Sequence, residues 1–275
     1  MSTLPLTELT DPERRLAAAQ YERDGFFLAP ALIPPELLAR VRPRIDAVYA
    51  GEYETGRTPE GAPPGRKEPP TSLVKINNAH CSDRTIHEFV THPAIGRWAA
   101  ALTGSKWVQV FATQMLIKPP GSRDNGNVGW HQDYEYWDGA FTGEVFTAWA
   151  AVSDVTAESG PMRFVPGSQN WGLLKAGDFY GRDLDVVKRR LLEKSGATEW
   201  REVAAVLPPG GVSFHDKLTV HGSGPNLAAG PRVSFAIHLR TERSALRDGV
   251  KWSDIPFLND LDDPWDSPVY GEKST

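Results

Sequence analysis

Three residues of this chain could together hold a transition-metal ion. His131 and Asp133 are separated by one residue, and His221 follows far along the sequence. Two imidazoles and one carboxylate on one side of a metal leave the opposite side open, which is the ligand set of non-haem Fe(II) oxygenases. In a strand, residues i and i+2 point the same way, so we expect His131 and Asp133 to converge while Gln132 faces away. A His-x-Asp pair alone is a weak signal, because such pairs also occur in turns and on surfaces.

Arg232 and Ser234 indicate what the open side of the metal would bind. They belong to segment 231–241, in which polar and apolar residues alternate. Such alternation is most often that of a strand with one face in water. In the alternative that we pursue, the polar face lines the interior, Arg232 makes a bidentate pair with a carboxylate, and Ser234 adds a hydroxyl donor. A guanidinium fork suits the C5 carboxylate of 2-oxoglutarate, whose 2-oxoacid end can chelate iron.

His215 is a rival to His221 for the third ligand position, since it lies only six residues earlier. We prefer His221, because the eleven-residue step from His221 to Arg232 would take the chain through a turn to the adjacent strand. On this interpretation the ligand and the carboxylate-binding arginine are neighbours in one sheet.

The elements that must position these residues change from helical to strand periodicity near residue 105. Residues 10–104 are predicted to be largely helical. One helix takes Asp11 as its N-cap and ends near Gly25, a second begins at 34–36, and a third covers 93–102.

From about 105 to 245, short segments of alternating polarity are punctuated by Gly and Pro, which predicts a sandwich or barrel. In the longest segment, 106–118, Gln114 shares a face with Val108, Val110, Ala112, Leu116 and Lys118. Further strands are expected at 128–133, 145–152, 162–166, 211–215, 218–222 and 231–241. A polar, helical insertion at 172–203 would be either a lid or a passive surface excursion. The acidic tail, 253–275, is expected to be loosely packed.

Composition is that of an ordinary globular protein. The 275 residues are 40% hydrophobic and 24% charged, with a net charge of −5. No basic face is therefore expected for nucleic acid or an anionic membrane, and no apolar run approaches the length of a membrane span. A single cysteine, Cys81, favours a reducing compartment. We expect one cytoplasmic domain over 1–275.

Ordered segments across the chain resemble the phytanoyl-CoA dioxygenase family of Fe(II)/2-oxoglutarate oxygenases, which includes the ectoine hydroxylases. The segments are DGFFLAPALIPPELL (24–38), KPPG (118–121), GWHQDYEYWDG (129–139), AVSDVTAESGPMRFVPGSQN (151–170), and PGG, HGSGPN and PRVSF within 209–235. They span roughly 20–245, and the ordered set is far more specific than any one motif.

The resemblance implies a mainly β fold with flanking helices: a double-stranded β-helix, or cupin-like jelly roll, with helices on one sheet. It assigns His131, Asp133 and His221 to iron. It assigns Arg232 and Ser234 to the distal carboxylate of 2-oxoglutarate, with O2 as the oxidant.

The resemblance also suggests residues around the co-substrate and the substrate. In similar enzymes a Gln seventeen residues before the first ligand reaches the co-substrate, and that position here is Gln114. Alternatively, Gln114 is a core residue whose side-chain amide finds its hydrogen-bond partners within the protein. For Trp149, in mid-strand, we expect core packing. The candidate substrate contacts are Lys75, Asn78, His80, Trp137 and His238. They are chosen from their position in a loop or on a strand face, and Trp137 also because it resembles a pocket wall of these enzymes.

The implied reaction is hydroxylation, or another oxidation, of a small organic molecule with release of succinate and CO2. Asp133 argues against halogenation, because related halogenases have a small residue at that position, but desaturation, epoxidation and ring formation stay open. The acidic surface offers nothing obvious for a CoA phosphate, so we expect a free small molecule, of the kind made in secondary metabolism. Two alternatives are a hydrolase or isomerase using the triad with Zn(II) or another ion, and a catalytically silent cupin-like binding module.

Overall fold

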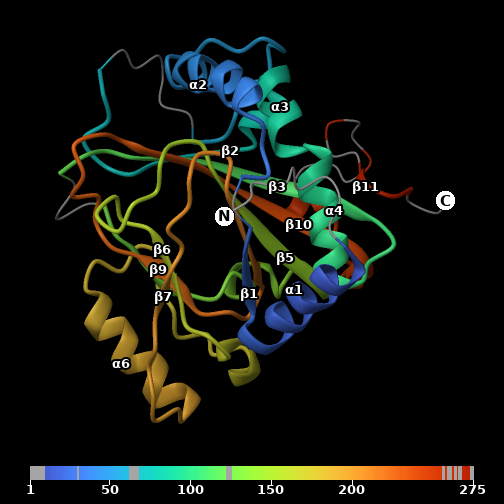
Figure 1. The fold of residues 1–275 in the computed structure, drawn as a ribbon, viewed down its shortest axis with the longest axis vertical. Helices are drawn as coiled ribbons and strands as arrows, with labels where there is room; N and C mark the ends of the chain where they lie inside the picture. Colours follow the sequence, from blue (N-terminus) through green and yellow to red (C-terminus); the bar gives the residue numbers. More distant parts are fainter. Residues whose placement is uncertain are drawn as a thin grey trace.

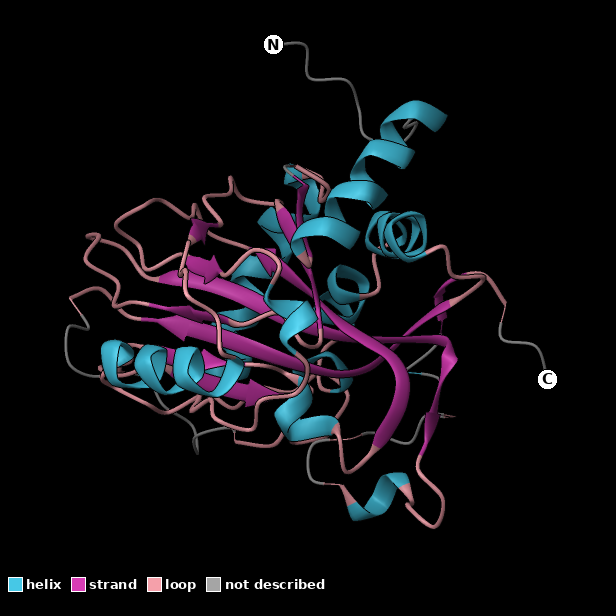
Figure 2. Ribbon diagram, turned by 90° about the horizontal axis from the view of Figure 1, so that it is seen from below, coloured by secondary structure: helices cyan, strands magenta, loops and turns pink. Residues whose placement is uncertain are grey.

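The computed structural model describes residues 10–29, 31–61, 68–121, 126–255, 258, 262, 265 and 268–272. In this part of the chain, a large and a small antiparallel sheet are arranged with helices around them (Figure 1). Viewed from below, the strands run through the middle of the molecule and the helices lie outside them (Figure 2). This is the double-stranded β-helix with flanking helices that was predicted.

The large sheet has the order β1-β8-β5-β10-β3-β11, and β2 also pairs with β3. Its strands are β1 (Phe26–Ala29), β2 (Val74–Asn77), β3 (Val108–Lys118), β5 (Phe141–Ala151), β8 (Val212–Asp216), β10 (Arg232–Leu246) and β11 (Pro268–Tyr270). The small sheet has the order β4-β9-β6-β7. Its strands are β4 (Val128–His131), β6 (Met162–Phe164), β7 (Val203–Ala204) and β9 (His221–Ser223).

The described helices are α1 (Asp11–Asp24), α2 (Pro35–Tyr49), α3 (Arg84–Val90), α4 (Pro93–Thr103), α5 (Tyr134–Trp137) and α6 (Leu184–Ser195), with 3-10 turns η1 (Ala79–Cys81), η2 (Ser168–Trp171) and η3 (Trp252–Asp254). Of these, α1, α2, α4 and α6 lie close to predicted positions, whereas α3 and α5 were not predicted. The predicted N-cap of α1 is wrong by one residue: Thr10 caps the helix and forms a capping box with Glu13. Within the described ranges, no helix is both long and apolar enough to cross a bilayer.

The two faces of the large sheet have different partners. One face packs under α2, α3 and α4 and forms the main apolar core, to which β10 contributes Phe235, Ile237 and Leu239. The opposite face turns toward the small sheet, where Leu116, Trp149 and Phe164 belong to a second buried cluster. Because helices shield the outer face, the polar face of β10 lies inside the molecule and not in water.

Strand β3 departs from the predicted alternation at a β-bulge. Ala112 is paired with His238 of β10, whereas Leu239 is paired with Val110, so that Phe111 is the extra residue. Val110 therefore joins the core under the helices, and the prediction that it shares a face with Gln114 is wrong.

The C-terminal tail is not loose where the structure describes it. Strand β11 pairs with β3, and Val269 is buried against α4. The approach is close because Gly96 of α4 has no side chain: a Cβ there would overlap the carbonyl oxygen of Val269. Most of 256–267 lies outside the described residues.

Replacing Gly96 tests this contact. Gly96→Ala should lower the free energy of unfolding by about 1–3 kcal/mol, because the overlapping atom belongs to backbone and cannot swing away. Gly139→Ala is the control, since a Cβ at Gly139 meets no atom within 4 Å. Equal denaturation midpoints for the two variants in urea would show that β11 does not dock tightly.

Candidate metal centre

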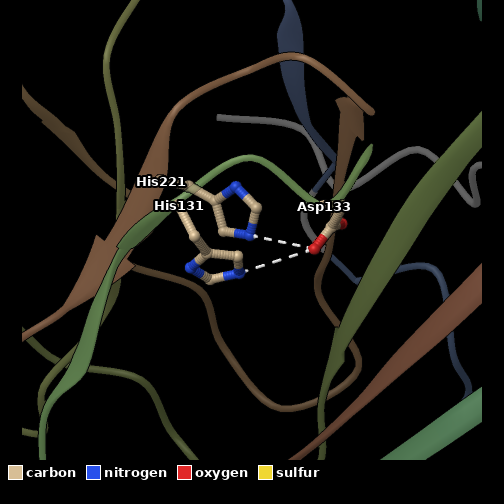
Figure 3. Close-up of side chains that lie close together, drawn as sticks. All are labelled: His131, Asp133 and His221. Atoms are coloured by element: carbon tan, nitrogen blue, oxygen red, sulfur yellow. Dashed lines mark ion pairs between the residues drawn. The ribbon is translucent and has the colours of Figure 1, made fainter. Parts of the chain in front are cut away.

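His131, Asp133 and His221 meet in the interior between the two sheets, with their ligand atoms all within 4.8 Å of one another (Figure 3). Nε2 of His131 lies 3.5 Å from Oδ1 of Asp133, and Nε2 of His221 lies 3.6 Å from the same oxygen. The two histidines are paired across β4 and β9. All three side chains are buried, so one ion placed among them would contact two imidazoles and one carboxylate.

Asp133 reaches this point by a different route from the one predicted. Strand β4 ends at His131, and Asp133 has helical backbone angles at the start of α5. His131 and Asp133 do converge, as predicted. The reason given for it is wrong, because Asp133 does not lie in a strand. Gln132 does face away, and its amide donates to the carbonyls of Gly172 and Leu218.

Both histidines are held in the tautomer that a metal requires. Nδ1 of His131 lies 2.8 Å from the carbonyl oxygen of Gly129, and Nδ1 of His221 lies 2.9 Å from that of Thr219. A carbonyl only accepts, so each Nδ1 carries the hydrogen and each Nε2 presents a lone pair toward Asp133. Burial, together with the neighbouring His131, holds the pKa of His221 well below its ordinary value. The donor set thus fits a divalent transition metal.

The second oxygen of Asp133 is held by protein donors. Oδ2 accepts hydrogen bonds from Oγ1 of Thr147 at 2.6 Å and from Nε2 of His215 at 3.1 Å. Burial alone would raise the pKa of Asp133, but electrostatic interaction with His221 and the hydrogen bond from His215 keep it well below the usual range. Oδ1 is left to face the two imidazoles. His215, the rival ligand, therefore lies behind the carboxylate as an orienting group.

The reason given for preferring His221 over His215 does not hold. β9, which carries His221, belongs to the small sheet, whereas β10, which carries Arg232, belongs to the large one. The eleven residues between them cross from one sheet to the other, so the ligand and the arginine approach the pocket from opposite sides.

A cavity of about 40 Å³ surrounds the triad. It lies between the sheets, and both sheets contribute to its wall. Besides the three ligands, its lining includes Gln114, Trp149, Phe179, Ser223, Arg232 and His238. Gln114 is thus inward-facing, as predicted. Trp149, for which core packing was expected, also lines the cavity; its even spacing from Thr147 and Ala151 places it on the inner face of β5.

Arg232 is buried without a carboxylate partner among the described residues. Its Nη1 donates to the carbonyl of Gly160 at 2.8 Å, and its guanidinium lies 5.1 Å from the ring centre of Trp149. Its Nε and the hydroxyl of Ser234 have no hydrogen-bond partner there. Burial lowers the pKa of Arg232 to about 10. Unpaired buried donors of this kind are rare, and here two occur on one strand face.

Lys118 is a second buried cation that sequence reasoning did not single out. It is paired with Arg232 in the β3–β10 register, and its Nζ donates to Oγ of Ser223 at 2.7 Å and to the carbonyl of Gly224 at 2.5 Å. Burial, reinforced by the charge of Arg232, holds the pKa of Lys118 well below its ordinary value. The available signal was a lysine on the inward face of a strand, a position where lysine is seldom buried.

The predicted substrate contacts separate into three groups. His238 lines the cavity and Trp137 packs against it, with ring centres 4.7 Å apart. Lys75 lies in a second, larger cleft. The structure does not bring Asn78 and His80 into either space. Both bind Thr113, which faces the helices: Oδ1 of Asn78 accepts from its backbone N–H, and Nδ1 of His80 lies 2.8 Å from its hydroxyl.

The insertion at 172–203 is more than a passive excursion. As predicted, it contains a helix, α6, whose Val187 and Leu191 pack with Trp130 in a buried cluster. Just before α6, the ring of Phe179 lies 5.2 Å from that of His131. The insertion therefore covers one side of the metal site, and movement as a lid is one of the two alternatives that the sequence left open.

Comparison with known proteins agrees with this geometry. Residues 21–234 match the family model described as Phytanoyl-CoA dioxygenase (PhyH). L-Proline trans-4-hydroxylase of Streptomyces griseoviridis is 26% identical over 58% of this chain, a match that spans 56% of that protein. Ectoine dioxygenase of Bordetella bronchiseptica is 26% identical over 78% of this chain and 71% of its own length.

A solved structure gives the same result for the fold. The epimerase SnoN, crystallised with Fe3+, alpha ketoglutarate and nogalamycin RO, is 25% identical and has a TM-score of 0.67. The similarity covers 88% of this chain and 89% of SnoN.

Thr147→Val tests whether the hydrogen bond from Thr147 orients the carboxylate of Asp133. Loss of the hydroxyl should weaken Fe(II) binding about 10–100-fold, because the carboxylate loses its shortest orienting hydrogen bond. Anaerobic competition with a chelator measures the dissociation constant. Thr113→Val is the matched control, since Thr113 is equally buried but faces the helices. The same Fe(II) affinity in both variants would exclude the orienting role.

Proposed function

The chain belongs to the phytanoyl-CoA dioxygenase family, and we propose that it hydroxylates, or otherwise oxidises, a free small organic molecule with release of succinate and CO2. Membership makes it an oxidoreductase that uses iron, 2-oxoglutarate and O2. The substrate and the position of attack are part of the proposal.

The observation that carries the proposal is that Arg232 is buried beside the metal triad without a carboxylate partner among the described residues. Removing a guanidinium from water costs several kcal/mol unless an anion compensates it. Within the described residues no carboxylate does so, and Nε of Arg232 and Oγ of Ser234 are left without acceptors. A dicarboxylate with one end on the metal and the other on Arg232 and Ser234 would satisfy both donors.

Iron bound with 2-oxoglutarate and O2 supplies the oxidising chemistry. The chain supplies position and exclusion of water. We assign His131, His221 and Oδ1 of Asp133 to the metal. Thr147 and His215 keep the second carboxylate oxygen away from it. Because both sheets close around a small cavity, little water can reach the reacting groups.

We assign the co-substrate to the side of the cavity that holds the two buried cations. Arg232 and Ser234 would hold its distal carboxylate. The ring of Trp149 packs against the guanidinium of Arg232. Lys118 donates to Ser223 and keeps its hydroxyl in place. Gln114 lines the same cavity and is available to the co-substrate as a donor or acceptor.

The substrate is proposed to enter from a larger cleft of about 760 Å³, a size that suits an organic ligand. Phe179 lines both this cleft and the metal cavity, so it lies between them. Lys75 stands over Phe179, with Nζ 4.6 Å from the ring centre, and Arg182 adds a second cation. These charges favour a molecule with a polar or anionic group at the end remote from the metal.

The two alternatives explain less. A hydrolase or isomerase with this triad would leave Arg232 and Ser234 buried without a function. A silent binding module would not need two histidines held in the metal-binding tautomer. The cytoplasmic location suggested by the single Cys81 stays a prediction.

Substitution of Arg232 separates co-substrate binding from metal binding. Arg232→Ala should raise the KM for 2-oxoglutarate about 10–100-fold with little change in Fe(II) affinity, because charged hydrogen bonds to the distal carboxylate are lost. Arg163→Ala is the control, since Arg163 pairs with Glu202 outside the pocket. Arg232→Lys should restore the affinity for 2-oxoglutarate only in part. This variant replaces Arg232→Ala in the test if the alanine variant is unstable. An unchanged KM would refute the carboxylate role.

A succinate-release screen with Fe(II), ascorbate and a library of small organic molecules tests the function itself. We expect at least one compound to increase succinate release in the intact chain, and none to do so in Asp133→Ala or His131→Ala. Metal-dependent turnover that needs neither O2 nor 2-oxoglutarate would instead establish the hydrolase or isomerase. Activity retained in both variants would remove the metal assignment.

A further inference from the structure

His238, which lines the metal cavity, has one buried ring nitrogen without a partner among the described residues. It lies on the inner face of β10, is 4% exposed, and lines the cavity with the triad. Its ring packs against Trp137 and Phe111, with ring centres at 4.7 and 5.9 Å. Nδ1 lies 3.0 Å from Oγ1 of Thr147, whereas Nε2 has no partner among the described residues.

The hydrogen bonds of Thr147 decide which nitrogen of His238 carries the hydrogen. Oδ2 of Asp133 belongs to an ionised carboxylate and can only accept, so the Thr147 hydroxyl must donate to it, at 2.6 Å. The hydroxyl has no second hydrogen to give. It must therefore accept from His238, which requires a hydrogen on Nδ1.

A neutral imidazole has one N–H, so Nε2 is then left as a lone pair. Burial lowers the pKa of His238 to about 4, which keeps the ring neutral near pH 7. A buried acceptor without a donor is unfavourable, and a ligand that supplies the donor removes that cost.

We propose that Nε2 of His238 accepts a hydrogen bond from the substrate, so that the enzyme selects molecules with an O–H or N–H group close to the carbon that is oxidised. The proposal rests on the proposed function, in that the cavity beside the triad receives the substrate. His238 is a specificity-determining residue in this role, separated from the metal carboxylate by Thr147. The opposite tautomer would favour carbonyl or ether oxygens instead, so the position of one hydrogen distinguishes two substrate classes.

The tautomer is tested directly by NMR on the full chain labelled with ¹⁵N-histidine. Two-bond ¹⁵N–¹H spectra should give a pyrrole-type Nδ1 and a pyridine-type Nε2 for His238, both metal-free and with Zn(II) as a diamagnetic substitute for iron. The chain has only seven histidines, and His238→Asn identifies the signal. Thr147→Val should mix the two tautomers, because the acceptor of Nδ1–H is lost. A hydrogen on Nε2 in the unmodified chain would overturn the proposal.

Donor selection is tested with three probes of similar shape: phenol, aniline and anisole. Phenol offers O–H, aniline offers N–H, and anisole offers no donor. We expect phenol or aniline to bind about 3- to 10-fold more tightly than anisole and to shift the Nε2 signal. The better of the two identifies the donor. Equal affinities, including no binding by any probe, would overturn donor selection.

Two variants separate the acceptor from the packing of the ring. His238→Asn can still donate to Thr147 but has no atom at the position of Nε2, so the preference over anisole should disappear. His238→Gln can place its amide oxygen there, and the preference should partly return. The same preference in wild type and His238→Asn would contradict the proposal. Because none of these measurements uses turnover, their failure would leave the succinate-release result unaffected.

Discussion

The buried carboxylate of Asp133 is the group on which the rest of the site depends. An ionised carboxylate removed from water must be surrounded by donors or cations. Asp133 meets this need at one oxygen through Thr147 and His215, while its other oxygen faces the lone pairs of His131 and His221, where a bound metal ion would supply the positive charge. These four side chains come from β4, β9, β5 and β8, which belong to both sheets. The carboxylate therefore requires the two sheets to be in one relative position.

A second electrostatic requirement lies at the other side of the cavity, where Arg232 and Lys118 are buried as neighbours in the β3–β10 register. Proteins rarely bury two basic side chains next to each other without an acidic partner. Here the helices α2, α3 and α4 shield the outer face of the sheet, which allows its inner face to carry charge. One face of the large sheet thus borders the apolar core, and its other face borders a polar interior. A dianionic co-substrate would neutralise the charge of Arg232 in that interior.

Much of this site was predictable because strand side chains alternate. The alternation in 231–241 placed Arg232 and Ser234 on one face, and the inward position of Gln114 followed in the same way. Prediction failed where the backbone leaves the ideal strand. The bulge at Phe111 reverses the faces of β3, and Asp133 enters a helix where a strand was expected. The strands β1, β2, β7 and β11 have two to four residues each, too few to show a period.

The sequence alone indicated the candidate residues for binding a metal and a carboxylate, since residue type and spacing are written in the chain. Only the tertiary structure decided how they are placed: that His215 contacts Asp133 from behind while His221 faces the metal position, that Asn78 and His80 bind Thr113, and that Nε2 of His238 is left without a partner among the described residues. The physical reason is the short range of hydrogen bonds. Their partners lie on strands distant in sequence, and a shift of one residue in register would change every donor and acceptor.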